Sequence, residues 1–479
     1  MTIREMNQRL RITRLFDRNP NPTVALGIIA LLSGLLMTVP ASQADAQQTT
    51  PPNSMLQMGM HVPQAKDGVW PDVPIGSIRL WDTGVSWREI NTAPGVYDWS
   101  TLDRVVSLAN SKGAAVLYAF GNTPEWAAEP KCLAAQGGAI KGAGANCPPS
   151  EIKHFVDFAS ALAERYSGRI ESYEMWNEAN IGTFWRGTVN ELFDMTTAGA
   201  NAIRAKAPKA KIVSASVTTR LVSSFTRFLP EYLSFLKAAN WPIHAFAVHT
   251  YPAGYFEGPS PRAQAYRAID ARTQSFRQAR ALFDQFDMPW SVEVWDTELN
   301  FGLAGPGATP HTDYPETLQA TLLSYAYFES HYWGIARTYW FAWGPKDQAS
   351  VVKFGVTTDN GTTGAKAFQR VGEWIRAGLW DGEFPICLGS APADERQSQP
   401  CVNISKTYPG SGSAFIVVGP SENQDFWNRW YTGLSQVFWP TLGPCLDSSQ
   451  ITGPLPRELV SQTPFILATE VTCAGLGAR

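Results

Sequence analysis

Eight short apolar runs of β-strand character alternate with amphipathic segments between residues 55 and 377. Strands that alternate with helices are typical of parallel sheets, because each helix returns the chain to start the next strand in the same direction. Eight such units in about 320 residues predict an α/β fold of the (β/α)8 type, a TIM barrel. A doubly wound sheet is the alternative, but no glycine-rich phosphate loop follows the first run.

The predicted strands and helices follow one another without a repeat of the sequence itself. The strand-like runs are Met55–Val62, Gly76–Trp81, Gly113–Phe120, Ile170–Glu178, Ile212–Val217, Ala245–Thr250, Trp290–Glu298 and Ala336–Trp343. The helical segments are Ser100–Ser111, Lys153–Tyr166, Leu192–Ala205, Phe225–Ala239, Tyr266–Phe286, Thr317–Tyr332 and Gly364–Ala377. We therefore assign residues 55–380 to the barrel.

The composition changes after Trp380. Residues 381–479 contain Pro, Gly and Ser turns and short β-like runs such as Ser413–Val418 and Pro464–Val471. We predict a small, β-rich, disulfide-bearing accessory domain there. Its aromatic residues pack it against the barrel or, alternatively, bind carbohydrate; they are Trp427, Trp430, Tyr431, Phe438 and Trp439.

The N-terminus has the pattern of an export signal. Residues 1–46 combine an Arg-rich start, an apolar run over Val24–Val39 and the small-x-small site Ala44-Asp45-Ala46. The apolar run is short for a membrane span, so we expect cleavage and no stable membrane insertion afterwards. An uncleaved N-terminal anchor is the alternative. Residues 47–54 form a polar linker, and we expect a secreted or periplasmic protein.

The cysteines fit an oxidising compartment. The chain has six, an even number, without the C-x-x-C spacing of zinc or redox sites. Six cysteines allow 15 pairings. Pairing of neighbours is the simplest, and it joins 132 to 147, 387 to 401 and 445 to 473.

Charge and aromatic content narrow the class of partner. A formal net charge of −3 provides no basic surface for nucleic acid. The 18 Trp and 15 Tyr residues favour carbohydrate instead, since aromatic rings stack on sugar rings, although most of them are expected in the core. We expect an oligo- or polysaccharide partner, and the oligomeric state stays open.

Two carboxylates end strands that face each other in the predicted barrel. The fourth run ends in Trp176-Asn177-Glu178, and the seventh ends in Trp295-Asp296-Thr297-Glu298. Functional groups of such barrels project from the carboxyl ends of the strands. Two opposed carboxylates are what glycoside hydrolysis needs, one to protonate the leaving oxygen and one to attack carbon or activate water.

Two other acids compete for these roles. Glu293 lies on the same run as Glu298, and because their positions differ by an odd number, a regular strand would point the two side chains to opposite faces. Glu298 is preferred because it sits at the strand end. Glu174 lies four residues before Glu178, deeper in the barrel, where we expect a structural partner of an Arg or His.

Residues at other strand ends are candidates for holding the substrate. Arg79 provides a positive charge that keeps Glu298 ionised. His249 and Tyr251 offer hydrogen-bonding groups, although a lone His is more often a satisfied core residue. Trp340 and Trp343 are alternative floors for a sugar ring, and Trp343 is nearer the strand end.

Three further residues have two interpretations each. His61 lines the cleft or is structural, and Asn122 and Glu125 line a substrate channel or cap a turn. The loop between Cys132 and Cys147 is expected beside the cleft.

These motifs resemble the glycoside hydrolases of clan A, which are retaining (β/α)8 enzymes, and within the clan family 39 and its relatives more than family 5. The resemblance spans about residues 55–377. It rests on Arg79, Trp176-Asn177-Glu178, His249, Tyr251, Asp296-Thr297-Glu298, Trp343, Val96-Tyr97-Asp98-Trp99 and Asn122-Thr123-Pro124-Glu125-Trp126. It implies that Glu178 is the acid/base, Glu298 the nucleophile and Asn177 a ligand of the sugar 2-hydroxyl.

The expected protein is an exported retaining glycoside hydrolase that cleaves β-glycosidic bonds. It needs no cofactor, and no metal-spaced His/Cys cluster is visible in the sequence. A transglycosylase would use the same two acids. A non-catalytic sugar-binding or exopolysaccharide-handling barrel is the alternative from another class, and it predicts the loss of one carboxylate.

Overall fold

The structure is a computed structural model of the chain. It describes residues 54–135, 141–252, 256, 258, 260–304, 310–345, 353–376, 401–408, 412–418, 437–443, 445–447, 450, 465–468 and 473–474. The predicted leader, all of the predicted linker except Ser54, and the predicted domain boundary at residue 380 lie outside these residues.

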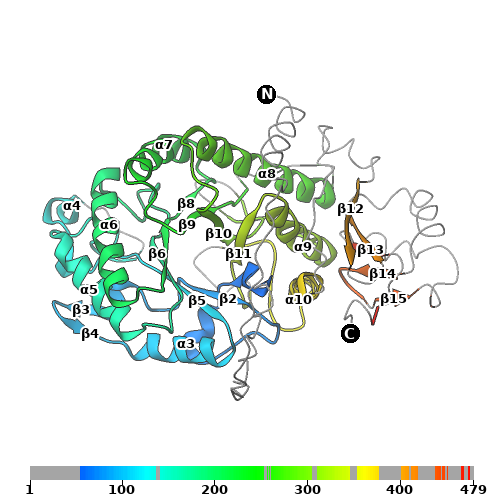
Figure 1. Ribbon diagram of the computed structural model, residues 1–479, viewed down its shortest axis with the longest axis horizontal. Coiled ribbons are helices and arrows are strands. Elements are labelled where there is room, and N and C mark those ends of the chain that lie inside the picture. The colour runs from blue at the N-terminus through cyan, green and yellow to red at the C-terminus, as the bar shows by residue number, and fades with distance from the viewer. Residues whose placement is uncertain are drawn as a thin grey trace, which may run out of the picture. The chain divides into compact units, whose positions relative to one another are not determined.

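Eight parallel strands close into a barrel, which confirms the predicted fold (Figure 1). In barrel order they are β1 (Met58–Met60), β2 (Ser77–Leu80), β5 (Ala115–Ala119), β6 (Ser172–Trp176), β7 (Lys211–Ala215), β9 (Ala245–His249), β10 (Glu293–Leu299) and β11 (Ile335–Trp340). Pairing of β9 with β10 and of β11 with β1 completes the circle. Each strand falls within or beside one of the eight apolar runs of the sequence.

A ring of helices surrounds the strands (Figure 1). The long helices are α3 (Ser100–Ser111), α5 (Ile152–Arg165), α6 (Val189–Lys206), α7 (Val222–Ala238), α8 (Pro261–Gln285), α9 (Glu316–Tyr332) and α10 (Thr363–Arg376). All seven predicted helices are present. At the start of α6, Thr188 and Glu191 form a capping box, in which each side chain binds the other residue's backbone N–H.

Several shorter helices and strands lie in the loops that connect these elements. They are the 3-10 turns η1 (Ser54–Gln57), η2 (Pro63–Asp67) and η3 (Glu125–Ala127), helices α2 (Trp87–Ile90) and α4 (Pro130–Ala134), hairpin strands β3 (Asn91–Ala93) and β4 (Val96–Tyr97), and β8 (Val217–Thr218), which pairs with β9.

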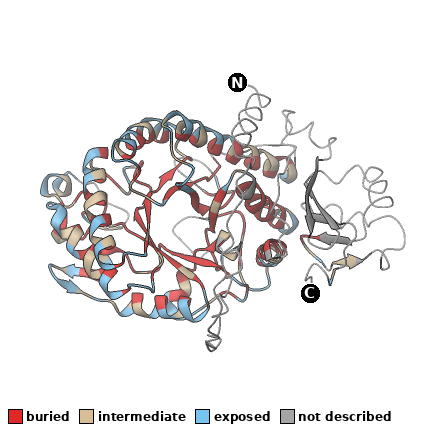
Figure 2. Cartoon of the chain, viewed as in Figure 1, coloured by how far each residue is buried: buried red, intermediate tan, exposed pale blue. Residues whose placement is uncertain are grey.

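The core has two layers, as Figure 2 shows by the buried strands and the buried inner faces of the helices. The larger layer lies between strands and helices and accounts for the apolar periodicity of the helical segments. A smaller cluster fills the barrel interior. Its members come from five strands and are Leu117, Val213, Ala245, Ala247, Trp295 and Tyr339. Filling of the interior by side chains makes this barrel a packed scaffold rather than a pore.

The C-terminal segment contains a five-stranded antiparallel sheet, in agreement with the predicted β-rich region. Its order is β12 (Cys401–Tyr408), β13 (Gly412–Val418), β16 (Phe465–Ala468), β14 (Val437–Pro440) and β15 (Leu446–Asp447). Trp427, Trp430 and Tyr431 lie outside the described residues, as do the side-chain surroundings of Phe438 and Trp439.

Two disulfides join the predicted neighbours, Cys132 with Cys147 and Cys445 with Cys473. The first ties together the loop that precedes α5. The third predicted pair involves Cys387, which lies outside the described residues.

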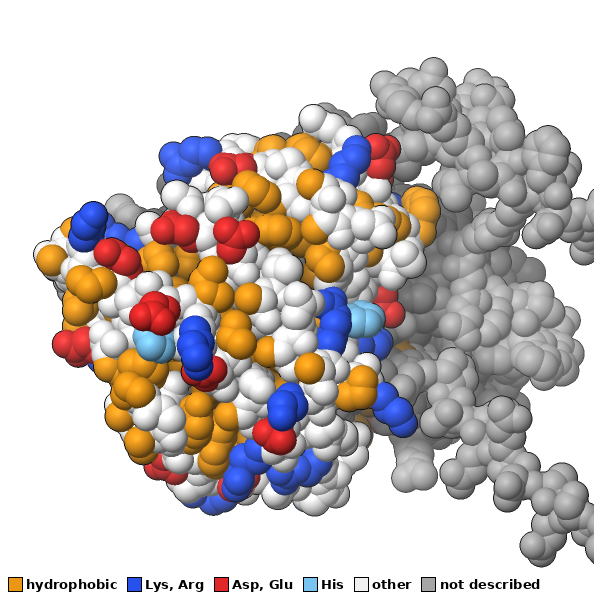
Figure 3. All heavy atoms as spheres, turned by 60° about the vertical axis from the view of Figure 1, so that its left-hand side comes forward, with side chains coloured by type: hydrophobic (Ala, Val, Ile, Leu, Met, Phe, Trp, Pro, Cys, Tyr) orange, Lys and Arg blue, Asp and Glu red, His pale blue; other side chains and the backbone are white. Residues whose placement is uncertain are grey.

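The surface carries charges of both signs. On the face displayed in Figure 3, Lys and Arg side chains alternate with Asp and Glu and form no large patch of one sign. None of the helices described here is both long and apolar enough to cross a bilayer.

A buried ionic network lies behind β10, on the side that faces the helices. Arg272 of α8 donates to Asp296 at 3.1 Å and to Glu329 of α9 at 2.6 Å. The hydroxyl of Thr250 accepts a bond from Arg272 at 2.9 Å and also binds Asp296. These side chains are at most 1% exposed. The network therefore joins the ends of β9 and β10 to two helices.

Replacement of Arg272 by Met should leave two buried carboxylates without their cation and cost about 3–5 kcal/mol of unfolding free energy. Urea denaturation followed by Trp fluorescence measures this loss. Arg280→Met on the same helix removes a cation whose partner Asp284 is 66% exposed, and it should cost about 1 kcal/mol or less. Equal losses in the two variants would contradict a structural role for the network.

Candidate active site

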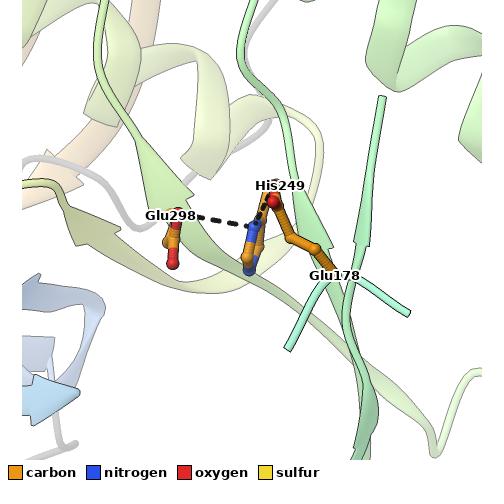
Figure 4. A group of neighbouring side chains, drawn as sticks. All are labelled: Glu178, His249 and Glu298. Carbon is orange, nitrogen blue, oxygen red and sulfur yellow. Dashed lines mark hydrogen bonds and ion pairs between the residues drawn. The ribbon is translucent and has the colours of Figure 1, made fainter. Parts of the chain in front are cut away.

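Three buried side chains meet where β6, β9 and β10 end. Glu178 follows β6, His249 ends β9 and Glu298 lies near the end of β10. Figure 4 shows His249 between the two acids. One donor or acceptor atom of each residue lies within 4.8 Å of those of the other two. The structure thus brings the two predicted acids together across the barrel mouth.

Glu298 is held by two donors. Arg79 Nη1 donates to its Oε1 at 2.6 Å, and the Tyr251 hydroxyl donates to its Oε2 at 3.0 Å. Burial raises the pKa of Glu298 above its ordinary value, and the attraction of His249 and Arg79 lowers it by less. Arg79 thus favours the ionised form as expected, but burial is the stronger effect.

Arg79 connects three strand ends. Its Nε donates to Glu174 Oε2 at 2.8 Å, and its Nη2 donates to Glu174 Oε1 at 2.6 Å. The same Nη2 also donates to Asn177 Oδ1 at 2.7 Å. Burial opposes the charge, but Glu174 and Glu298 outweigh it and raise the pKa of Arg79. Glu174 is therefore the structural partner that its deep position predicted. Among the described residues nothing hydrogen-bonds the buried Asn177 amide nitrogen, so this group can donate to a ligand.

Glu178 sits in an unusual backbone conformation. Its φ of +41° lies in the left-handed region, which non-glycine residues seldom adopt. The backbone N–H of Glu178 donates to Ser216 Oγ at 2.9 Å, which helps to hold this conformation. Strained residues of this kind cluster at functional sites. The strain here turns the Glu178 carboxylate toward His249.

His249 contacts both acids. Its Nδ1 lies 3.0 Å from Glu178 Oε1 and 3.6 Å from Glu298 Oε2, and its Nε2 lies 3.0 Å from Thr297 Oγ1. Burial alone would lower the pKa of His249, but attraction to Glu298 and the hydrogen bond to Glu178 raise it. The two acids thus favour the protonated form of His249, which lies between them.

The choice between Glu293 and Glu298 depends on the shape of β10. Glu293 is exposed at the start of the strand, where it binds Lys211 and the Trp295 indole. Pairing of β10 with β11 shifts register between Asp296 and Leu299. This irregularity breaks the strict alternation of faces and lets Glu298 enter the mouth although Asp296 points to Arg272.

Both aromatic candidates are buried. Trp343 is 2% exposed and packs in the core between strands and helices, as does Trp340. Trp343 as a sugar floor stays a prediction. Phe341, which the sequence analysis did not single out, belongs to a small cluster with Tyr251 and packs edge-on against His61 at 4.9 Å.

Of the three residues with two interpretations, His61 lies at the barrel mouth, and Asn122 and Glu125 lie in the loop after β5. His61 Nε2 binds the Thr297 carbonyl oxygen at 2.9 Å, and burial lowers the pKa of His61 well below its ordinary value, which keeps it neutral. Asn122 has a φ of +59° in the loop after β5. Glu125 begins η3, is 60% exposed and pairs with Arg88 at 3.6 Å.

Two residues that support the site were not predicted from the sequence. Thr297 orients His249, and Ser216 holds the Glu178 backbone. Nothing in the spacing of either residue distinguishes it from an ordinary strand residue.

The Glu178, His249 and Glu298 set also has donor types that suit a metal ion. Its lone pairs are directed elsewhere, however. Both Glu298 oxygens accept hydrogen bonds from Arg79 and Tyr251, and a guanidinium 2.6 Å away repels a second cation. The surroundings of these three residues therefore suit a pair of reacting carboxyl groups better than a metal-binding site.

Comparison with known families places the site in context. Residues 125–324 match the family described as glycosyl hydrolases family 39. That segment includes Glu178, His249 and Glu298, whereas Arg79 and Trp343 lie outside it. Comparison with curated protein sequences finds no match.

Solved structures share the fold at low sequence identity. A family 39 glycoside hydrolase from the gut symbiont Bacteroides cellulosilyticus WH2 superposes with a TM-score of 0.53 and 14% identity over 87% of this chain and 82% of that one. The GH39 enzyme from Xanthomonas axonopodis pv. citri gives a TM-score of 0.50 and 15% identity over 79% of this chain and 76% of its own.

The resemblance inferred from the motifs is thereby confirmed. The family match covers the segment that carries the paired acids, and the barrel is the fold of the similar enzymes. Over residues 125–324 the chain is thus similar to the family 39 glycosidases of clan A, and it shares their barrel fold.

Proposed function

We propose that the protein is an exported, retaining glycoside hydrolase that cleaves β-linked sugars in an oligo- or polysaccharide. The observation that carries the proposal is the short separation of the two acids, whose nearest oxygens lie within 4.8 Å. Retaining enzymes hold their carboxyl groups about 5–5.5 Å apart, whereas inverting enzymes need about 6.5–9.5 Å to admit a water molecule. The β configuration rests on the resemblance to clan A.

In the first step, a Glu298 oxygen forms a bond to the anomeric carbon while the glycosidic bond breaks. Glu178 gives its proton to the departing oxygen. In the second step, Glu178 takes a proton from water, the water oxygen bonds to the anomeric carbon, and Glu298 leaves. The Glu298 carboxylate is thus free again at the end of the cycle, and Glu178 has regained its proton.

The neighbouring groups support this division of roles. Arg79 and Tyr251 each donate a hydrogen bond to Glu298, which stabilises the negative charge of its carboxylate before the attack. Burial raises the pKa of Tyr251 well above its ordinary value, so the phenol keeps its proton. Asn177, held by Arg79 through its oxygen, has its amide nitrogen free for the sugar 2-hydroxyl.

Export is supported by two independent features. The first 46 residues have the basic, apolar and small-residue pattern of a signal peptide. The disulfides 132–147 and 445–473 are of a kind that persists outside the reducing cytosol.

Replacement of either acid should separate their roles. Glu298→Gln removes the attacking oxygen and should lower kcat/KM by at least about 100-fold on every substrate. Glu178→Gln should be similarly damaging on polysaccharides, yet less damaging to the first step on aryl glycosides, because an activated phenolate leaves without a proton. Rates on both substrate types measure this difference. Glu293→Gln, which changes an exposed Glu of the same strand, is the control; full activity in either acid variant would refute the assignment.

The stereochemistry of the first product tests retention directly. The hydrolysed sugar should appear first as the β anomer and then mutarotate, as followed by proton NMR within minutes of adding enzyme. Initial release of the α anomer from a β-glycoside would show inversion and would refute a covalent intermediate on Glu298.

The pH profile should depend on His249. Glu298 must be ionised to attack, so activity falls as the pH drops below its raised pKa. Attraction to His249 lowers the pKa of Glu298, and its loss in His249→Gln should raise that pKa further. The acid limb of kcat/KM should therefore move to higher pH. His244→Gln, a change at a histidine that binds the Ile212 N–H, should leave the limb in place. An unchanged limb in His249→Gln would contradict the charge coupling.

A transglycosylase remains the second candidate because it uses the same acid pair. Product analysis at rising acceptor concentration distinguishes the two, since a hydrolase continues to release free sugar. A non-catalytic sugar-binding role is disfavoured because both carboxylates are present and close. Labelling of Glu298 by a mechanism-based inhibitor would exclude it.

A further inference from the structure

An ion pair beside the barrel mouth joins two loops that lie far apart in the sequence. Lys141 belongs to the loop between the disulfide-bonded Cys132 and Cys147, and its ammonium group donates to Asp82, which follows β2. The Asp82 side chain is 15% exposed and that of Lys141 is 28% exposed, so both charges are largely withdrawn from water. Salt screens such a pair less than it screens a pair on the open surface.

Trp81 connects this ion pair to the proposed active site. The Lys141 ammonium nitrogen lies 5.8 Å from the centre of the Trp81 ring, and the guanidinium carbon of Arg79 lies 5.9 Å from the ring centre. Both cations are thus at cation–π distance from one aromatic side chain. Arg79 in turn donates to Glu298 at 2.6 Å. The disulfide-bonded loop therefore reaches the surroundings of the proposed nucleophile.

The neighbours of Trp81 fix its ring in place. The side chain is buried and packs edge-on against Phe184 in the loop after β6, with ring centres 5.8 Å apart. On the loop after β5, a side chain at Gly121 would meet two atoms of the Trp81 ring at 2.7 and 2.8 Å, so the ring requires a glycine there. Because the ring cannot shift, the position of Lys141 against it is also defined.

Glu298 is sensitive to the charge of Asp82. Burial is the largest cause of the raised pKa of Glu298, and repulsion by Glu178 and Asp82 raises it further, whereas His249 and Arg79 lower it. The groups that act on this carboxyl lie at the ends of β2, β6 and β9, and they are Arg79, Asp82, Glu178, His249 and Tyr251. His61 lies at the same mouth, but burial lowers its pKa and keeps it neutral.

We propose that Lys141 is a positioning residue that neutralises the charge of Asp82 beside the proposed nucleophile, so that the disulfide-bonded loop helps to set the acidity at which the enzyme works. This inference rests on the proposed hydrolase function and adds a residue that tunes it. Asp82 has no part in the proposed reaction, whereas Glu178 does. A cation on Asp82 therefore weakens the repulsion at Glu298 and leaves the two reacting acids unchanged.

The competing explanation is that Lys141 only holds its loop in place. The same loop also binds its neighbours through other groups, since the Thr123 N–H donates to the Ala145 carbonyl at 3.0 Å and the Asn146 amide donates to the Gly182 carbonyl at 2.8 Å. If Lys141 merely secured these contacts, its loss would slow the reaction at every pH. A test must therefore read the sign of a charge effect, which loosening of a loop does not produce.

The experiment measures kcat/KM of the purified enzyme against pH on an uncharged aryl β-glycoside, chosen as the best substrate of a panel. Such a profile reports ionisations of the free enzyme, and the activated phenolate leaves without a proton, so the acid limb reports Glu298. Lys141→Met leaves Asp82 unpaired and should move the limb to higher pH. Asp82→Asn removes the anion and should move the limb to lower pH. Each change should alter the rate on the limb about two- to tenfold.

The double variant Lys141→Met/Asp82→Asn removes both charges and should return the acid limb toward its native position. Asn suits this place because Asp82 has a φ of +60°, a left-handed conformation that Asn adopts more readily than most residues. Met keeps an apolar stem against Trp81 in place of the Lys stem. Thermal denaturation of each variant shows whether the folded fraction is comparable.

A matched ion pair at the opposite end of the barrel provides the control. Lys237 of α7 donates to Asp287 at 2.8 Å, and Asp287 lies in the loop before β10 with a φ of +54°. Lys237→Met and Asp287→Asn repeat the same chemical changes at the end of β10 that does not carry Glu298. Both control variants should leave the acid limb in place.

Two results would overturn the role of Lys141. One is an equal loss of rate at every pH in Lys141→Met, which would show that the residue only holds its loop. The other is an acid limb that stays in place, or moves in the same direction, in the two single variants. Either result would leave the hydrolase function intact. Full activity after Glu298→Gln would instead refute the proposed function itself.

Discussion

The active site depends on one buried guanidinium. Arg79 binds Glu174 from the strand that precedes the acid/base candidate, Glu298 from the strand that carries the nucleophile candidate, and Asn177 between them. A buried cation is tolerated only when anions and hydrogen bonds compensate it. That requirement forces the ends of β2, β6 and β10 together. The same contacts orient the Glu298 carboxylate and favour its ionised form, so the compensation of Arg79 and the positioning of the proposed nucleophile are one arrangement.

Departures from regular backbone geometry complete the site. Glu178 adopts a φ of +41°, and β10 shifts register before Glu298. Regular strands would have sent these side chains to the wrong face or left them in line with the barrel wall. The surrounding barrel holds both irregularities, since its strands are fixed by the packed interior and the helix layer. A rigid scaffold can thus maintain local strain where chemistry requires it.

The segment Asp296-Thr297-Glu298 shows how neighbouring residues divide their tasks. Asp296 faces the helices and belongs to the network of Arg272, Thr297 orients His249, and Glu298 enters the mouth. The network behind the strand fixes the backbone from which the catalytic groups project. Two buried arginines serve the two sides of this strand, because Arg79 and Arg272 each face two carboxylates.

The sequence by itself determined the barrel with its eight strands and seven helices, because these follow from apolar periodicity. It also pointed to two acids at the carboxyl ends of strands on opposite sides of the mouth, because barrel chemistry sits at those ends. It also indicated that Glu174 would pair with a cation. Only the tertiary structure decided how β10 turns Glu298 into the mouth while Asp296 faces Arg272, that Trp343 packs in the core and that Thr297 and Ser216 support the site. The physical reason is that side-chain direction depends on local register and backbone torsion, which neither composition nor spacing encodes.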